Sequence, residues 1–323
     1  MKLMRFLMAF IAMIGSSMIS ARAQVACPMP GSFDDPYPVM HEGSKSMFWT
    51  RPLEVDADGI RNAYHRDDPH GSKGLAIEYI GNGMTISRDG KPLEFNFKEE
   101  DNAEWLNAYR TIVANGWKAP TGWDVDIYGF ARDEKDRICV KDDGRLISVT
   151  SLVRYPGARY CNPNRYVDAL KLPGIVVPNR ADQEKPVAGA DQEVAPPFAN
   201  RGVSRGDLAI VYNPETRIWK GAFIYDTGPR HLLGEGSLRL VLDLRDEQHV
   251  PTSAVETNAL GIEETHVLLF PGTAKKLGPG RSWTQERIQT LAAEQFKRWG
   301  GGTITAALEK LLACADSYKT RFH

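Results

Sequence analysis

The segment GDLAIVYNPETRIWKGAFIYDTG, residues 206–228, decides the fold class because it holds two buried-strand patterns in succession. Residues 207–213 and 220–226 are runs of small and branched apolar residues, each bounded by turn-forming residues. Such runs are typical of strands that are buried on both faces. We therefore predict two core strands, with Asp207 as a structural residue at the start of the first and Asp226 at the end of the second.

Short β-like patterns continue on both sides of this segment, and the Asp-Gly pair at 89–90 predicts a hairpin turn. Many short strands with few helices favour a closed β-barrel to which helices are added. The fold class expected is therefore mainly β with added helices. The other predicted strands cover residues 46–50, 74–80, 84–97, 123–131, 136–142, 145–153, 171–178 and 266–272.

Three segments have helical features. Apolar residues at helical spacing predict a helix over 99–116. Ser282 and Gln285 have the spacing of a capping box, which predicts a helix that stops at the following glycine run, and 303–315 forms a second helix. Residues 238–244 fit a short helix or a strand equally well.

Residues 1–23 have the features of a secretory signal peptide. Lys2 and Arg5 precede an apolar run at 6–15, and Ala-Arg-Ala at 21–23 is a signal-peptidase pattern. The run is shorter than the roughly 20 residues that span a bilayer. We therefore expect a mature chain, residues 24–323, that is secreted or periplasmic.

The charge balance argues against nucleic acid as a partner. The whole chain carries 40 basic and 41 acidic residues; removing the three basic residues of the signal leaves 37 basic against 41 acidic. No basic run occurs anywhere, and no later segment is long and apolar enough to cross a membrane. We expect a mildly acidic monomer with neither nucleic-acid nor membrane partners.

The four cysteines, Cys27, Cys139, Cys161 and Cys314, are an even number in an exported chain, which favours disulfides. Four cysteines allow three connectivities. We favour Cys139–Cys161, which joins neighbouring segments, and Cys27–Cys314, which ties the two ends of the chain together. Free buried thiols are the alternative.

Two acidic residues stand in the turn-rich segment YDTGPRHLLGEG, residues 225–236. Asp226 ends a predicted strand, and Glu235 lies between two glycines that let a ligand approach the backbone. Leu232 and Leu233 can desolvate Glu235 and raise its pKa, as a general acid requires. Two carboxyls in unlike surroundings suit acid–base catalysis, although a charged hairpin without catalysis fits the same residues.

Asp56 and Asp58 alternate at strand spacing, so their side chains are expected on one face, before a glycine. They read either as a polar turn or as a rim that binds sugar hydroxyls or amines. No motif meets the ligand spacing of a zinc or calcium site. No metal and no organic cofactor are therefore expected.

The stretch YDTGPRHLLGEGS resembles the catalytic segment of glycoside hydrolase family 75, the fungal-type chitosanases, in particular exported bacterial-like members. That family has an Asp at a strand end, a glycine-containing turn and then a G-E-[AG]-S motif. Further pieces follow in the family's order: VDADG at 55–59, VTSL at 149–152, YVDALKLPGIVVP at 166–178, GDLAIVY at 206–212, LFPG at 269–272 and WGG at 299–301.

The resemblance covers most of the mature chain, which implies one domain over 24–323. Residues 179–202 are then a long loop, and 282–316 are C-terminal helices packed on the barrel. The family's barrel is similar to the double-psi β-barrels, and its two catalytic carboxylates correspond to Asp226 and Glu235. The family inverts the anomeric configuration.

We therefore expect an endo-acting, inverting glycoside hydrolase that cleaves β-1,4-linked glucosamine polymer (chitosan), with Glu235 as the acid and Asp226 as the base. Neighbours alone suggest this division of roles, and it could be reversed. The alternatives are a hydrolase of peptidoglycan, which has the same β-1,4 linkage, and a non-catalytic glycan-binding barrel. Further substrate contacts are expected from Asp56, Asp58, Tyr166, Asp168, Thr227 and Ser237.

Overall fold

The computed structural model describes residues 26–33, 37–96, 102–179, 194–228 and 232–322. The predicted signal peptide, residues 1–23, and most of the predicted 179–202 loop lie outside these described residues. The description below concerns the described residues only.

Six strands form a closed barrel. They are hydrogen-bonded in the order β3, β10, β7, β9, β8 and β11, and β11 pairs with β3 to close the ring. The pairs β3–β10 and β7–β9 are parallel, and the other four are antiparallel. The predicted barrel is confirmed. Its strands are β3 (Ser46–Asp56), β7 (Gly174–Pro178), β8 (Leu208–Asn213), β9 (Ile218–Gly228), β10 (Glu235–Ser237) and β11 (Ile262–Phe270).

The two strands predicted from residues 206–228 are the centre of this barrel. Every residue of β8 is buried, as is the stretch of β9 that runs from Gly221 to Thr227. Asp207 is fully buried beside them and accepts hydrogen bonds from the backbone N–H groups of Ser204 and Ala274. Its predicted structural role is confirmed.

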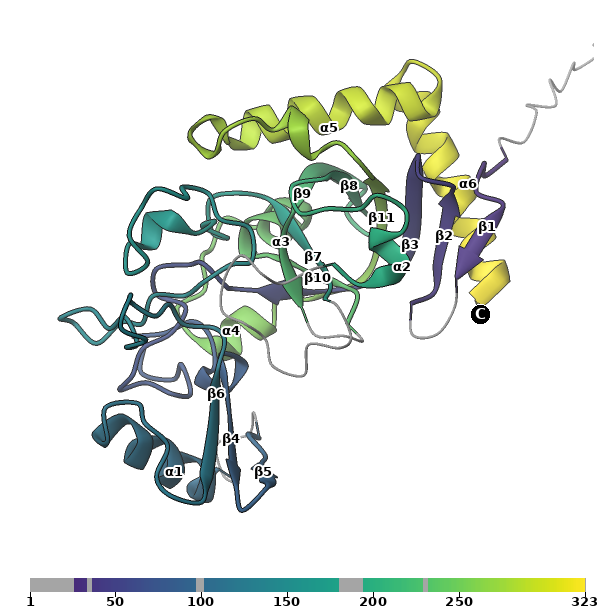
Figure 1. The fold of residues 1–323 in the computed structure, drawn as a ribbon. Helices are drawn as coiled ribbons and strands as arrows, with labels where there is room; N and C mark the ends of the chain where they lie inside the picture. The colour runs from purple at the N-terminus through teal and green to yellow at the C-terminus, as the bar shows by residue number, and fades with distance from the viewer. Residues whose placement is uncertain (1–25, 34–36, 97–101, 180–193, 229–231, 323) are drawn as a thin grey trace, which may run out of the picture.

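Additional strands extend this frame. β1 (Gly31–Phe33) and β2 (Val39–Glu42) continue the barrel sheet beyond β3. A separate sheet of β4 (Met84–Arg88), β5 (Lys91–Leu93) and β6 (Trp123–Ile127) lies with α1 (Ala103–Ala114) at the end of the molecule opposite α5 (Figure 1). The predicted turn at 89–90 joins β4 to β5, with positive φ angles at both residues.

Helices cover the barrel, as predicted. α5 (Gln285–Gly300) packs on β8 and β9, and α6 (Ile304–Phe322) packs on α5, β3 and β11 (Figure 1). The predicted N-cap is wrong: Thr284 accepts the N–H of Arg287, whereas Ser282 belongs to the preceding 3-10 turn.

The ambiguous segment after Ser237 is a helix, α3 (Leu238–Arg245), capped by that serine. The remaining short elements are α2 (Pro196–Ala199), α4 (Ala254–Asn258), η1 (Ile80–Asn82), η3 (Pro163–Arg165), η4 (Ala274–Lys276) and η5 (Gly280–Ser282).

Three predicted strands are absent from the described structure. Residues 136–142 and 145–153 make only isolated bridges, because positive-φ turns at Asp136 and Gly144 fold the segment back on itself. Residues 74–80 form bends that lead into η1. The apolar residues of these segments are buried by irregular backbone, which a strand pattern cannot reveal.

Both predicted disulfides are present. Cys27 is bonded to Cys314, and Cys139 to Cys161. The first joins the start of the described chain to α6. The second joins the irregular segment at 136–142 to the turn that precedes η3.

Candidate active site

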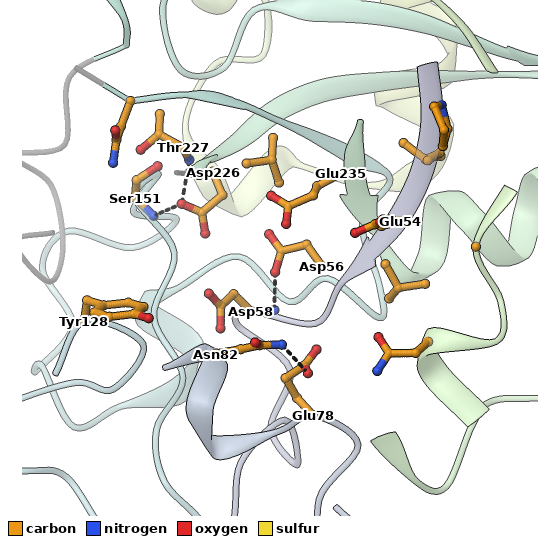
Figure 2. Close-up of a pocket in the computed structure, with 18 of the residues that line it drawn as sticks. Glu54, Asp56, Asp58, Glu78, Asn82, Tyr128, Ser151, Asp226, Thr227 and Glu235 are labelled. Carbon is orange, nitrogen blue, oxygen red and sulfur yellow. Dashed lines mark hydrogen bonds between the residues drawn. The ribbon is translucent and has the colours of Figure 1, made fainter. Parts of the chain in front are cut away.

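A cavity of about 1180 Å³ opens at one end of the barrel. It is lined by the ends of β3, β9 and β10 together with Asn82 of η1 (Figure 2). Thr85 of β4 and Asp126 of β6 line it from the smaller sheet. Among the described residues, no Lys or Arg lines it. Eight carboxyl groups do: Glu54, Asp56, Asp58, Glu78, Asp126, Asp226, Glu235 and Glu263.

The barrel register brings Asp226 and Glu235 into this cavity from two strands that both pair with β7. Asp226 lies opposite Val176, and Gly236, the neighbour of Glu235, lies opposite Ile175. Their carboxyl groups both point into the cavity (Figure 2). The sequence prediction that these two acids share a site therefore agrees with their placement.

Asp226 is 7% exposed, and backbone donors hold it in place. Its Oδ1 accepts hydrogen bonds from the N–H groups of Ser151 (2.9 Å) and Thr227 (2.7 Å). Burial, followed by the charge of Asp56, raises the pKa of Asp226 to about 7, and the two N–H donors oppose that rise. Asp226 can therefore exchange a proton near neutral pH.

Glu235 is half-buried and accepts no hydrogen bond from any described residue. Burial raises its pKa well above the ordinary value, and the charges of Asp56, Glu54 and Asp226 add to the rise. Glu54 is its register partner on β3. A carboxyl in these surroundings retains its proton more readily than Asp226, whose anion is stabilised by two donors.

The sequence suggested that Leu232 and Leu233 raise the pKa of Glu235, but the structure gives other causes. Leu232 is 38% exposed, and neither it nor Leu233 lines the cavity, so other carboxyls and the barrel itself desolvate Glu235. The glycines do not admit a ligand to the backbone either. A Cβ on Gly234 would lie 2.3 Å from the carbonyl oxygen of Pro52, so this glycine allows close strand packing.

Asp56 and Asp58 both line the cavity, but only Asp56 belongs to β3, and Asp58 stands in the turn that follows it. Asp56 Oδ1 accepts the backbone N–H of Asp58 at 2.8 Å. Asp58 Oδ1 accepts the hydroxyl groups of Tyr64 and Ser148, each at 2.9 Å. Burial raises the pKa of both aspartates, and for Asp58 the charges of Asp56 and Asp226 raise it further.

The other predicted contacts divide into two groups. Thr227 lines the cavity, but Tyr166, Asp168 and Ser237 do not. Tyr166 is buried against the Cys139–Cys161 region, and its hydroxyl donates to the carbonyl of Tyr160.

Asp168 pairs with Lys171 and accepts the N–H of Leu170, which fixes a turn. Ser237 is fully buried; its hydroxyl donates to the carbonyl of Leu172 and accepts the N–H groups of Gly174 and Leu240. These side chains support the fold around the site and do not contact the cavity.

Sequence reasoning missed many polar residues of the cavity wall, among them Glu54, Glu78, Asn82 and Tyr128. Glu54 continues the alternation of Asp56 and Asp58 and could have been found by extending it by one step. Glu78 stands inside the wrongly predicted strand at 74–80, so no local pattern marks it. Burial raises the pKa of Tyr128 to about 12, so its hydroxyl remains a hydrogen-bond donor at neutral pH.

Among the described residues, no group of three or more His, Cys, Asp or Glu side chains is arranged to hold a metal ion. None of the described helices combines the length and apolar character that crossing a bilayer requires. Comparison of the chain with protein-family models gave no match, and a search of curated proteins found no significantly similar sequence.

Proposed function

We propose that this protein is an exported glycoside hydrolase that cleaves β-1,4-linked glucosamine polymer. The observation that carries the proposal is the cavity wall, which gathers eight carboxyl groups without a described Lys or Arg. The resemblance of the sequence to glycoside hydrolase family 75 supports the same function. The two disulfides support export, because disulfides persist in exported proteins.

A wall of carboxyl groups favours a cationic ligand, which stabilises their ionised forms. Carboxylates that are removed from water are costly unless a positive charge compensates them, and the described wall supplies none. A glucosamine unit carries one amine that is positively charged when protonated. A polymer of such units brings the missing charge to several carboxyls at once.

Glu235 acts as the general acid in this proposal. Its raised pKa keeps the proton that it donates to the glycosidic oxygen as the bond to the leaving sugar breaks. Asp226 acts as the general base and takes a proton from the attacking water. The Ser151 and Thr227 N–H groups fix the Asp226 carboxylate in the orientation that this step requires.

An inverting reaction needs room for that water. Carboxyls of inverting glycosidases stand roughly 6.5–9.5 Å apart, against about 5–5.5 Å when one is the nucleophile. Asp226 and Glu235 belong to strands on opposite sides of β7. We propose the inverting route, in which water attacks the sugar directly, because the resemblance to family 75 implies it.

The test is a reducing-end assay with chitosan and peptidoglycan side by side. The acidic wall predicts release from chitosan, because the amines of peptidoglycan sugars are acetylated and neutral. Asp226→Asn and Glu235→Gln should each lower turnover by about 10²–10⁴-fold, the range of general acid–base assistance. Glu286→Gln, the same charge change at an exposed position in α5, is the matched control and should retain full activity.

Release of reducing ends from peptidoglycan but not from chitosan would favour a hydrolase of peptidoglycan. Binding of chitosan without any reducing ends would favour a non-catalytic barrel. If either variant keeps more than about a tenth of the wild-type activity, the residue that it replaces does not have its assigned role.

A further inference from the structure

Glu78 is a buried cavity carboxyl that the proposed reaction does not use. It precedes η1, is 4% exposed, and lines the cavity. Its Oε1 accepts the backbone N–H of Tyr79 at 2.8 Å and the side-chain amide of Asn82 at 2.7 Å. In Figure 2, Asp56 and Asp58 lie between Glu78 and the Asp226–Glu235 pair.

The second carboxyl oxygen of Glu78, Oε2, differs from Oε1 in its hydrogen bonding. No described residue donates a hydrogen bond to Oε2, and no described Lys or Arg lines the cavity. An ionised carboxylate has about four acceptor positions, so the two on Oε2 are available to a ligand that enters the cavity. A cationic donor there would stabilise the ionised form of Glu78.

We propose, on the basis of the hydrolase function above, that Glu78 and Asn82 form a subsite that binds the ammonium group of a glucosamine unit. Oε2 of Glu78 accepts one N–H of the ammonium group, in a hydrogen bond that both charges strengthen. The amide oxygen of Asn82, whose nitrogen donates to Glu78, accepts a second. An N-acetyl group carries no positive charge, so this subsite selects deacetylated units.

Binding of an ammonium group at this subsite releases a proton from Glu78. Burial raises the pKa of Glu78 to about 7, with a further contribution from Asp56, while the two hydrogen bonds to Oε1 oppose the rise. At pH 6 the empty subsite therefore holds a proton on Glu78. An ammonium group favours the carboxylate, so binding releases that proton, and the release can be measured without turnover.

The first experiment compares Glu78→Gln with the Glu286→Gln control on fully deacetylated and on partly N-acetylated polymer. Loss of a hydrogen bond to a charged group lowers affinity by about tenfold to one-hundredfold. We expect kcat/KM to fall by that factor on the deacetylated polymer, through KM, and by less than about threefold on cleavage at acetylated units. An equal loss on both polymers, or no loss on either, overturns the proposal.

Asn82→Ala provides a second variant, because it keeps the Glu78 carboxyl and removes only its partner. This variant should also reduce the preference for deacetylated over acetylated units, by about threefold to tenfold. An unchanged preference in this variant also overturns the subsite, even if Glu78→Gln does not fold.

The second experiment separates this proposal from the proposed reaction. Glucosamine hexamer is titrated by calorimetry into Glu235→Gln and into the double variant with Glu78→Gln, at pH 6 in two buffers of different ionisation enthalpy. We expect Glu235→Gln to release up to about one proton more than the double variant. This difference supports the subsite even if the wild-type protein cleaves no chitosan, and equal release overturns it even if chitosan is cleaved.

Discussion

Gly228→Ala should reduce activity without removing a carboxyl group. Gly228 is the last residue of β9, and its Cα faces Glu235. A Cβ at this position would lie 2.8 Å from Glu235 Oε2 and 3.0 Å from Val176 Cγ1, whereas ordinary contact begins at 3.4 Å. The Glu235 carboxyl must therefore move by about 0.6 Å or more.

The expected losses of stability and of kcat depend on which atom must move. Oε2 is the end of a flexible side chain, so the backbone stays in place and the free energy of unfolding should fall by no more than about 1 kcal/mol. A misplacement of about 1 Å at a catalytic group can cost about 10²-fold in rate. We expect kcat on deacetylated polymer to fall roughly tenfold to one-hundredfold.

The assay is reducing-end release at saturating substrate, with thermal unfolding of the same samples. Gly157→Ala is the matched control, because a Cβ at Gly157 meets nothing within 4 Å and its φ is not positive. The control should retain wild-type kcat. A Gly228→Ala protein that unfolds normally and keeps more than half of the activity would refute the reasoning, since the carboxyl of Glu235 would then tolerate displacement.

Three further predictions concern pH, disulfides and stereochemistry. Burial raises the pKa of Glu78 and Asp226 to about 7, so their contribution to stability is complete below about pH 4 and is lost as pH rises through 7. At about 1.4 kcal/mol per pKa unit, each contributes up to about 4 kcal/mol, and a urea midpoint at pH 8 as high as at pH 5 would contradict this. The denatured protein should show no free thiols without reductant, and peptide mapping should recover the two disulfides described above. Early time-course NMR should show the α-anomer as the first product, whereas a β-anomer would make one catalytic carboxyl a nucleophile.

The elements that the sequence alone determined are those whose signal is local. The strands around Asp207 and Asp226 follow from runs of apolar residues, and the turn at 89–90 follows from an Asp-Gly pair. The alternation of Glu54 and Asp56 on β3 likewise places both in the cavity wall, because side-chain direction along a strand has a period of two. Each of these patterns depends only on neighbours within a few residues.

Only the tertiary structure decided which polar groups meet. The barrel closes by pairing β3 with β11, although more than two hundred residues separate them in the chain, and this closure defines the mouth that holds the carboxyls. Glu78 enters that mouth from irregular backbone, whereas Tyr166 and Asp168, which the sequence analysis expected to contact substrate, point into supporting structure. Register and chain crossing set these distances, and neither is encoded in a short stretch of sequence.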